Sequence, residues 1–260
     1  MTGSDQVWGP VATDKFDPAY FLDFAAGKKR VAYAASFGRT QFDQFTIEQY
    51  KKLLEGYNSI AVRENAAVET IKGMNLPAPD QVLDPTLLLN ADEWSHLISD
   101  GDKAPEGEYI LVYQIHNNPA LDEYARKLSE HTGKPLYRIS PSLHQIRRGG
   151  HFIWLPTLGK FLATIKNASL MVTDSFHGTA FAINFNTQFV EILPNNGTGS
   201  RNQSILALTG LSDRVITAPE DFETPARQID FNAVNKILCQ ERQKSMDILK
   251  KMISLCHTKE

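Results

Sequence analysis

The chain has few cysteines and no long apolar segment. Only two cysteines, Cys239 and Cys256, occur among its 260 residues, and both fall in one expected C-terminal helix. A helix rises about 1.5 Å per residue, so the two thiols would lie about 25 Å apart and could not pair. This usage fits a reducing compartment. No secretory leader opens the chain and no apolar run reaches the roughly 20 residues of a membrane span, so we expect a cytoplasmic protein.

An excess of one charge and several common short motifs are also lacking. The formal net charge of -3 gives no reason to expect nucleic acid as a partner. The sequence contains no Gly-Lys-Ser/Thr phosphate loop, no His-Glu-x-x-His motif and no Gly-x-Gly-x-x-Gly after a strand. The seven histidines show no paired spacing typical of zinc. We therefore expect no metal and no tightly bound dinucleotide.

Strand-like and helix-like segments alternate along almost the whole chain. This alternation predicts an α/β fold with a mostly parallel sheet. Several strand segments are continuously apolar, as expected for strands that are covered on both faces. The predicted strands are residues 31–35, 59–62, 81–83, 109–114, 135–139, 170–173 and 188–193.

The composition also predicts where the chain divides. Residues 99–108 are rich in Asp, Gly and Pro, which is typical of a linker. We expect an N-terminal half over residues 1–104, a C-terminal half over 105–226, and a long terminal helix over 227–260 that packs back on the body. Residues 3–6 look like the loop after a strand although no strand precedes them, so we expect the N-terminal half to be truncated.

The segment over residues 170–183 is the most informative one. A short apolar run ends in Thr-Asp-Ser, followed by His-Gly-Thr and an apolar stretch of helical character. A strand that leads into the first turn of a helix collects backbone N–H groups and the positive end of the helix dipole, which suits an anionic ligand. His177 adds a titratable proton donor there. Ser175 and Thr179 either bind the same anion or cap the helix.

Five short segments in chain order carry a resemblance to a known family. They are GSDQVW (3–8), AYAASFG (32–38), VRE (62–64), LDPTLLL (83–89) and TDSFHGT (173–179). Together they resemble the polysaccharide pyruvyl transferase family over nearly the whole chain. The resemblance implies two Rossmann-like halves similar to the fold of GT-B glycosyltransferases.

The resemblance also implies an activity. The family transfers a pyruvyl group from phosphoenolpyruvate to two hydroxyls of a sugar, which gives a cyclic ketal in exopolysaccharide or other cell-surface glycans. Phosphoenolpyruvate is then the donor substrate, so no cofactor is expected. The expected partners are this donor and a sugar acceptor, free or lipid-linked. The oligomeric state is left open.

The implied donor site centres on His177 as the catalytic acid and phosphate ligand. Arg63 matches the family's Val-Arg-Glu segment and is expected to bind the donor, the alternative being a surface salt bridge to Glu64 or a neighbour. Many family members have arginine two positions before the histidine, where this chain has Ser175. Arg201, in the loop expected after the last strand, is a candidate to replace that cation.

The implied acceptor site lies near the start of the chain. Asp5 is expected to act as the base toward a sugar hydroxyl, or alternatively to fix its own loop. The Gln6 amide can bond a hydroxyl, and the Trp8 indole can stack on a pyranose ring or pack in the core. Two other functions stay open: a GT-B-like glycosyltransferase that uses a nucleotide sugar, and a non-catalytic relative that binds a glycan.

Overall fold

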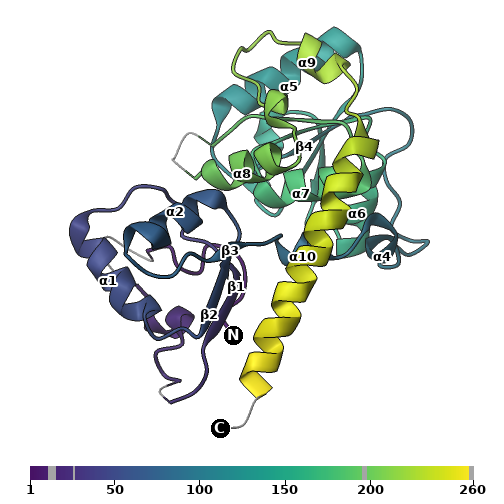
Figure 1. The fold of residues 1–260 in the computed structure, drawn as a ribbon. Helices are drawn as coiled ribbons and strands as arrows, with labels where there is room; N and C mark the ends of the chain where they lie inside the picture. Colours follow the sequence, from purple (N-terminus) through teal and green to yellow (C-terminus); the bar gives the residue numbers. More distant parts are fainter. Residues whose placement is uncertain (11–15, 26, 195–197, 258–260) are drawn as a thin grey trace. The chain divides into compact units, whose positions relative to one another are not determined.

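The computed structural model describes residues 1–10, 16–25, 27–194 and 198–257, and the chain divides into two compact units (Figure 1). The first unit comprises Met1–Leu88, Gln203–Ile205 and Leu238–Glu260. The second comprises Leu89–Asn202 and Leu206–Ile237. Each unit has its own parallel sheet and its own core.

The first division between the units falls after Leu88 and not at the linker-like residues 99–108. The reason is that the chain after Leu88 already packs inside the second unit. In α4 (Ala91–Ser95), the Trp94 ring makes an edge contact with Phe181 at 5.1 Å. Asp102 accepts a hydrogen bond from the Thr157 hydroxyl, so the Asp- and Gly-rich stretch is a surface loop of that unit.

The first unit contains a three-stranded parallel sheet in the order β1-β2-β3, with bounds Val31–Ala35, Ser59–Val62 and Asp80–Gln81. Thr2 and Asp5 bridge to β1 on its other side in the parallel sense. The register shifts between Ala32 and Ala35, and Ala34 has a positive φ of 56°. This bulge ends the regular pairing just before the loop at Ser36.

The two faces of this sheet are covered by different helices. One face packs an aromatic cluster that includes Trp8 and Tyr50 and involves α1 (Gln44–Leu54) and α2 (Asn65–Gly73). The other face packs against the last turns of α10 (Phe231–His257), drawn in yellow in Figure 1. The long amphipathic terminal helix expected from the sequence therefore exists. Short elements complete the unit, namely η1 (Pro18–Phe21) and α3 (Pro85–Leu88).

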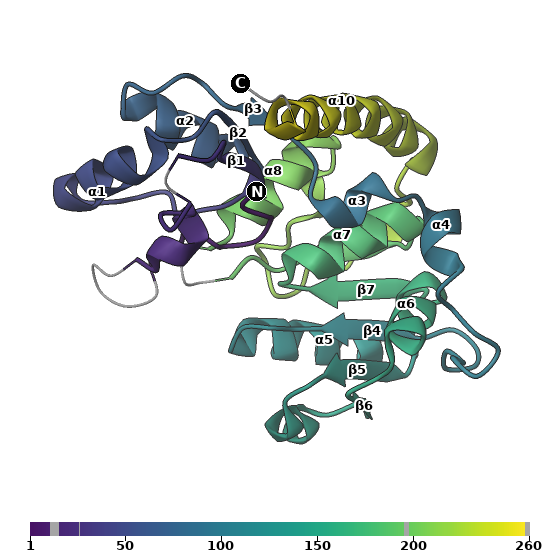
Figure 2. The ribbon, with the colours of Figure 1, turned by 90° about the horizontal axis from the view of Figure 1, so that it is seen from below.

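The second unit contains a five-stranded, fully parallel sheet in the order β6-β5-β4-β7-β8. Figure 2 shows the arrows of β4, β5 and β7 pointing the same way. The chain starts in the middle at β4, winds outward through β5 and β6, and returns to the other side of β4 with β7 and β8. The strands are Ile110–Tyr113 (β4), Leu136–Ser140 (β5), His151–Trp154 (β6), Leu170–Thr173 (β7) and Phe189–Glu191 (β8).

Helices cover both faces of this sheet as well. The apolar face of α5 (Pro119–Thr132) packs with Val112 and Val172 in one core cluster. The other layer contains α6 (Leu158–Lys166) and α7 (Phe176–Phe185), in which Phe161 and Phe181 meet edge to face at 5.8 Å. The remaining elements are η2 (Leu143–Arg148), α8 (Ser200–Leu208), η3 (Ser212–Arg214) and α9 (Glu223–Ala226).

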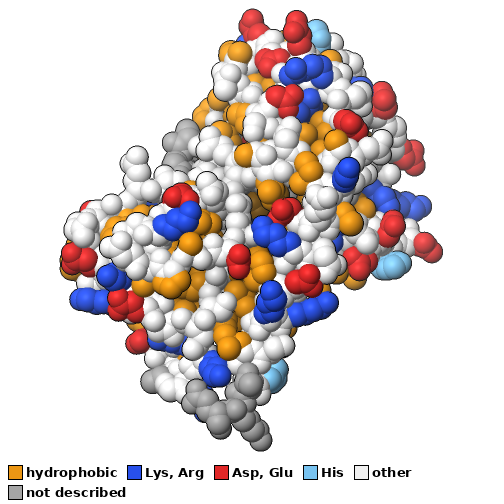
Figure 3. Space-filling model, viewed as in Figure 1, with side chains coloured by type: hydrophobic (Ala, Val, Ile, Leu, Met, Phe, Trp, Pro, Cys, Tyr) orange, Lys and Arg blue, Asp and Glu red, His pale blue; other side chains and the backbone are white. Residues whose placement is uncertain are grey.

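The distribution of charge on the surface and the apolarity of the helices both agree with the composition. On the face drawn in Figure 3, basic and acidic side chains are interspersed and do not form a field of one sign. Among the described residues, no helix combines the length and apolarity that a membrane crossing needs.

Candidate functional site

The order of the second sheet defines where a ligand would bind. In open parallel sheets, ligands bind at the carboxyl ends of the strands where neighbouring strands lead off in opposite directions. In this unit that point lies between β4 and β7, where Tyr113 pairs with Thr173. The residues that follow these two strands are therefore the first place to examine.

The turn between β7 and α7 is built tightly. The Thr173 hydroxyl donates to the Tyr113 carbonyl at 2.6 Å and accepts from the backbone N–H of Ser175 at 3.0 Å. The Ser175 hydroxyl accepts from the Gly178 N–H at 3.2 Å and so caps α7. A Cβ on Gly178 would lie 2.6 Å from Thr173 Oγ1 and 2.9 Å from the Tyr113 ring, so only glycine fits. The strand-turn-helix predicted from the sequence is confirmed.

His177 occupies the second position of α7. It is half-buried, and its ring meets that of Phe176 edge to face at 5.5 Å. The positive end of the α7 dipole lies at the same turn, which favours a negatively charged ligand there. The structure therefore gives His177 the position that its predicted role requires, and the role itself stays a prediction.

Asp174 connects this turn to the loop after β4. Its carboxylate is fully buried and accepts the backbone N–H groups of Ile115 at 2.8 Å and of His116 at 3.1 Å. The Nδ1 atom of His116 lies 3.4 Å from Oδ2 of the same carboxylate. Burial raises the pKa of Asp174, while the two N–H groups and His116 act in the opposite direction. A second imidazole is thus fixed at the edge of the sheet that carries His177.

Thr179 takes part in a buried hydrogen-bond group behind the turn. Its hydroxyl contacts the Ser175 carbonyl at 3.1 Å and one carboxyl oxygen of Glu191, whose other oxygen accepts from the Asn202 amide. Full burial raises the pKa of Glu191 to about 8. In this structure the Thr179 hydroxyl supports the turn from inside and is not exposed to a ligand. The helix-cap alternative is what the geometry shows for Ser175, which is 1% exposed.

Two arginines lie at the same sheet edge of the second unit. Arg138, on β5, is fully buried and contacts Asp122 at 2.8 Å and the Gln114 amide oxygen at 2.8 Å. Arg148 shares Asp122 at 3.2 Å and also donates to the Asn117 side chain at 2.8 Å. Two guanidinium groups therefore share one carboxylate, which leaves this cluster with one net positive charge beside the His116 loop.

Arg63 forms the centre of a separate cluster in the first unit. It is only 5% exposed, and its guanidinium lies 2.8 Å from Asp84, 3.4 Å from Asp5 and 3.8 Å from Glu64. The Ser36 hydroxyl donates to Glu64 at 2.7 Å. Burial acts to raise the pKa of Asp84, but Arg63 opposes this and holds that pKa below its usual value. The salt-bridge alternative is thus realised, in buried form, and ties together the loops at the carboxyl ends of these strands.

The predicted acceptor residues have two different environments. Asp5 is exposed, has a positive φ of 75°, and accepts the Gln6 N–H at 2.9 Å, so it also fixes its own loop. Gln6 is exposed as well. Trp8 is 0% exposed and packs against Phe21 and Phe37 at ring distances of 5.9 and 5.3 Å. The core alternative therefore applies to Trp8, since no face of its ring is open to a sugar in this structure.

Arg201 does not lie in a surface loop as expected. It stands in the first turn of α8 and is 6% exposed. Helix α8 begins at Ser200, so Arg201 lies in a helix and not in a loop. A role for Arg201 as the replacement cation stays a prediction that this position does not favour.

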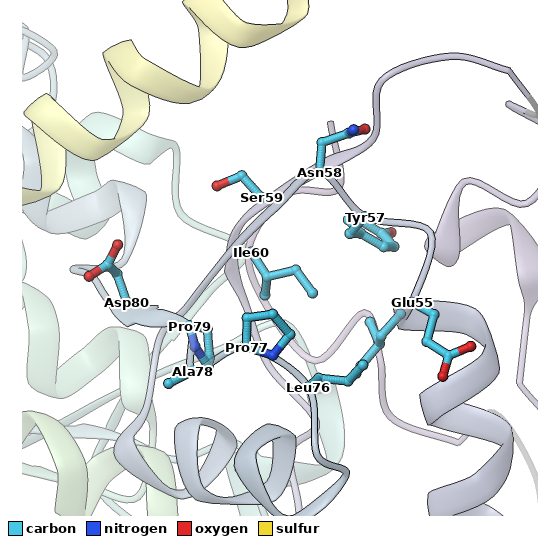
Figure 4. A pocket seen from close by; sticks show the side chains of 11 residues that line it. Glu55, Tyr57, Asn58, Ser59, Ile60, Leu76, Pro77, Ala78, Pro79 and Asp80 are labelled. Atoms are coloured by element: carbon cyan, nitrogen blue, oxygen red, sulfur yellow. The ribbon is translucent and has the colours of Figure 1, made fainter.

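A cavity in the first unit and a cavity in the second unit differ in their position on the sheet and in their lining residues. Figure 4 shows a cavity of about 310 Å³ in the first unit, lined by the Glu55 and Asp80 carboxylates and by Pro77. It lies at the amino ends of β2 and β3 and offers acidic groups, so it suits neither the usual ligand position nor an anion. In the second unit, an apolar cavity of about 360 Å³ opens at the carboxyl ends of β4 and β5, beside Tyr113 and Leu155.

Comparison with known sequences identifies the family. A family model described as polysaccharide pyruvyl transferase matches residues 1–196, which include the β7–α7 turn. The chain belongs to the polysaccharide pyruvyl transferase family. This membership confirms the resemblance read from the five short segments and supports a transferase. No curated protein matches the chain.

Comparison with solved structures shows the fold of this family member. A protein from Listeria monocytogenes assigned as UDP-N-acetylglucosamine 2-epimerase has a TM-score of 0.57 at 12% identity, over 94% of this chain and 72% of that one. The corresponding epimerase from Rickettsia bellii has a TM-score of 0.47 at 14% identity, over 87% and 68%. Spinosyn forosaminyltransferase SpnP has a TM-score of 0.48 at 13% identity, over 93% and 73%. The expected fold class, α/β with Rossmann-like halves similar to GT-B glycosyltransferases, is confirmed.

The sequence singled out Asp174 within the Thr-Asp-Ser turn and the Arg147-Arg148 pair, but it did not show that His116 would lie beside Asp174. These residues lie on three different segments, with Arg148 in η2, and no local spacing connects them. The only signal was that each follows a predicted strand. Among the described residues, no cluster of His, Cys, Asp and Glu is arranged to hold a metal ion.

Proposed function

We propose that this protein transfers a pyruvyl group from phosphoenolpyruvate to two hydroxyls of a sugar, which forms a cyclic ketal on a cell-surface glycan or exopolysaccharide. The observation that carries the proposal is the position of the family's Thr-Asp-Ser-Phe-His-Gly-Thr segment at the strand-order reversal of the second sheet. The proposal places the reaction in the cytoplasm, where phosphoenolpyruvate is made.

The donor carries a phosphate and a carboxylate, so its site needs cationic and N–H donors. The α7 N-terminus and His177 suit one anionic group. Arg148, with its share of the net positive charge around Asp122, suits the other. In this proposal Arg148 supplies the cation that Ser175 cannot, because the serine hydroxyl carries no charge and serves here as a helix cap.

The first step of the transfer moves two protons. The C3 carbon of the enol must gain a proton, and the attacking sugar hydroxyl must lose one. His177 is proposed as the acid toward C3. Asp5, which is exposed in the first unit, is kept as the proposed base toward the sugar, with Gln6 as a hydrogen-bonding partner of the acceptor.

The acceptor also needs an apolar surface, because a pyranose ring has a C–H face. Trp8 does not provide it, since its ring is enclosed. Trp154 is 52% exposed, and its indole N–H is held by the Pro141 carbonyl at 3.2 Å. Pro141, its hydrogen-bond partner, and Leu155, the next residue in the chain, both line the apolar cavity, so Trp154 is our proposed stacking surface for the acceptor.

Calorimetric titration with phosphoenolpyruvate tests the donor. We expect saturable binding to the wild-type chain, weaker binding to His177→Ala, and unchanged binding to His144→Ala, which removes an exposed histidine of the same unit. UDP-N-acetylglucosamine serves as the comparison ligand. Binding of the nucleotide sugar without binding of phosphoenolpyruvate would favour a glycosyltransferase. Absence of binding by both ligands in a folded sample would favour a non-catalytic relative.

A further inference from the structure

We propose that His116, held by the buried carboxylate of Asp174, is a second catalytic histidine of the transfer site and protonates the leaving phosphate. This assignment rests on the proposed pyruvyl transfer. It concerns a residue outside the Thr-Asp-Ser-Phe-His-Gly-Thr segment, on the loop after the neighbouring strand.

Topology brings the two residues together. The strands β4 and β7 are neighbours in the sheet although β5 and β6 lie between them in the chain. His116 follows β4, and Asp174 directly follows β7. Both therefore stand at the carboxyl edge where the strand order reverses, and His177 begins the helix three residues after Asp174.

Burial indicates that Asp174 does more than fix a loop. A buried carboxylate is costly unless its oxygens are paired, and both oxygens of Asp174 are directed at the loop of His116. Closing that loop alone requires only a neutral acceptor. The negative charge has a use in stabilising an imidazolium at His116, whose Nδ1 lies 3.4 Å from Oδ2.

The geometry leaves one nitrogen of the ring for chemistry. The side chain of His116 is 21% exposed while that of Asp174 is fully enclosed. Nδ1 lies 3.4 Å from the carboxylate, at ion-pair distance without a hydrogen bond, and Nε2 is the other nitrogen of the ring. A carboxylate that orients one nitrogen and stabilises the charged ring is the arrangement that a general acid needs.

The proton balance of the transfer closes with two histidines. His177 gives a proton to C3 while the first sugar hydroxyl bonds to C2 and loses its proton to Asp5, the proposed base, and solvent returns a proton to His177. When the bond from C2 to the bridging oxygen breaks, the oxygen keeps the electron pair and takes a proton from His116. The second hydroxyl then bonds to C2 and returns a proton to His116. One phosphate leaves for each ketal, without an oxidant or reductant.

Several other groups act electrostatically at this carboxylate. They are Tyr113 on β4, Arg138 on β5 and Glu191 on β8, each of which interacts with Asp174. His177 stands on α7. All of them stay in place in the variants below, so a change in the pH dependence of turnover in those variants reports on the pair of His116 and Asp174.

The first experiment measures phosphate release from phosphoenolpyruvate by the full chain with a panel of methyl glycosides of glucose, galactose and mannose. We expect His116→Ala to lower kcat by about 100-fold or more with little change in KM, and His144→Ala to match the wild type. Added imidazole should restore part of the rate to His116→Ala, and Asp174→Asn should shift the pH profile. Equal kcat in His116→Ala and the wild type would overturn the assignment.

The second experiment does not depend on turnover. Spectra of 15N-histidine should show the Nδ1 of His116 protonated in the wild type and altered in Asp174→Asn, and phosphoenolpyruvate should shift the His116 signal but not that of His144. Identical His116 signals in the wild type and in Asp174→Asn would overturn the assignment of His116. A His116 signal that does not respond to phosphoenolpyruvate while the His177 signal does would also overturn it. A wild type that binds no phosphoenolpyruvate at all would instead remove the proposed function.

Discussion

Glu191 and Thr179 share a hydrogen bond in the interior of the second unit that needs a proton on the carboxyl group. The Thr179 hydroxyl has one hydrogen, yet its oxygen contacts both the Ser175 carbonyl and Glu191. If Glu191 carries a proton, the carboxylic acid donates to Thr179 and Thr179 donates to Ser175, so every contact is satisfied. The pKa of Glu191, raised by burial to about 8, agrees with a neutral acid at neutral pH.

We therefore predict that Glu191 makes the protein less stable as the pH rises. The unfolded chain releases this proton near pH 4.5 and the folded chain only near 8, so the folded state binds more protons between these values. The stabilising contribution is complete below the unfolded pKa and is lost as the pH rises through about 8. Glu191→Gln keeps a neutral donor and acceptor at this position. The unfolding free energy of Glu191→Gln should match that of the wild type near pH 5 and exceed it by on the order of 1–3 kcal/mol near pH 9.

Urea unfolding at a series of pH values measures this difference. Glu106→Gln, which removes an exposed carboxylate in a loop of the same unit, is the matched control and should follow the wild type. Parallel loss of stability by Glu191→Gln and the wild type above pH 7 would show that Glu191 is ionised in the folded state.

The second prediction concerns Arg63. Arg63→Met removes the guanidinium that faces the buried carboxylates of Asp84 and Glu64, so we expect a loss of about 3–5 kcal/mol in unfolding free energy at neutral pH. The loss should shrink in acid, because the lowered pKa of Asp84 means that its stabilising contribution is lost as the pH falls through that value. Adding Asp84→Asn to Arg63→Met should recover part of the stability.

Denaturant unfolding of the single and double variants at pH 7 and at a series of pH values below the usual pKa of aspartate tests this role. Arg63→Lys keeps the charge without the planar fork and should fall between the wild type and Arg63→Met. A fully stable Arg63→Met that has lost its affinity for phosphoenolpyruvate would instead establish the donor-binding role predicted from the sequence.

Much of the strand pattern could be predicted because the strands are continuously apolar. The expected strands at 31–35, 59–62 and 170–173 coincide with β1, β2 and β7. β6 was not predicted, since His151–Trp154 is an exposed edge strand whose polar start resembles a basic loop. Such a strand exists because β5 pairs with it, and this pairing has no local signal.

The site was predictable only where it is local in sequence. The turn around Ser175 and His177 could be read from adjacent residues, because helix capping acts over three or four positions. The pairing of Asp174 with residues 115 and 116 depends on β7 returning beside β4 after two intervening strands. That return is decided by the packing of the whole sheet, so the role of His116 needed the structure.

The third prediction compares two tryptophans with opposite environments. Trp8→Ala removes a fully enclosed ring from the aromatic core of the first unit, so we expect a loss of about 3–5 kcal/mol in unfolding free energy. Trp154→Ala removes a half-exposed ring with one hydrogen bond to the Pro141 carbonyl, so we expect a loss below about 1.5 kcal/mol. Stability should therefore separate the two variants clearly.

The KM for the sugar should change when Trp154 is replaced and not when Trp8 is replaced, which is the reverse of the expected effect on stability. At a temperature where both variants are folded, Trp154→Ala should raise the KM for the sugar by about 10-fold, as expected from the loss of one stacking contact of about 1.5 kcal/mol, and leave the KM for phosphoenolpyruvate unchanged. Trp8→Phe, which keeps an aromatic ring in the core, should leave both KM values near those of the wild type. An increase in sugar KM for Trp8→Phe together with none for Trp154→Ala would reverse our assignment, because it would require the Trp8 ring to become accessible when the acceptor binds.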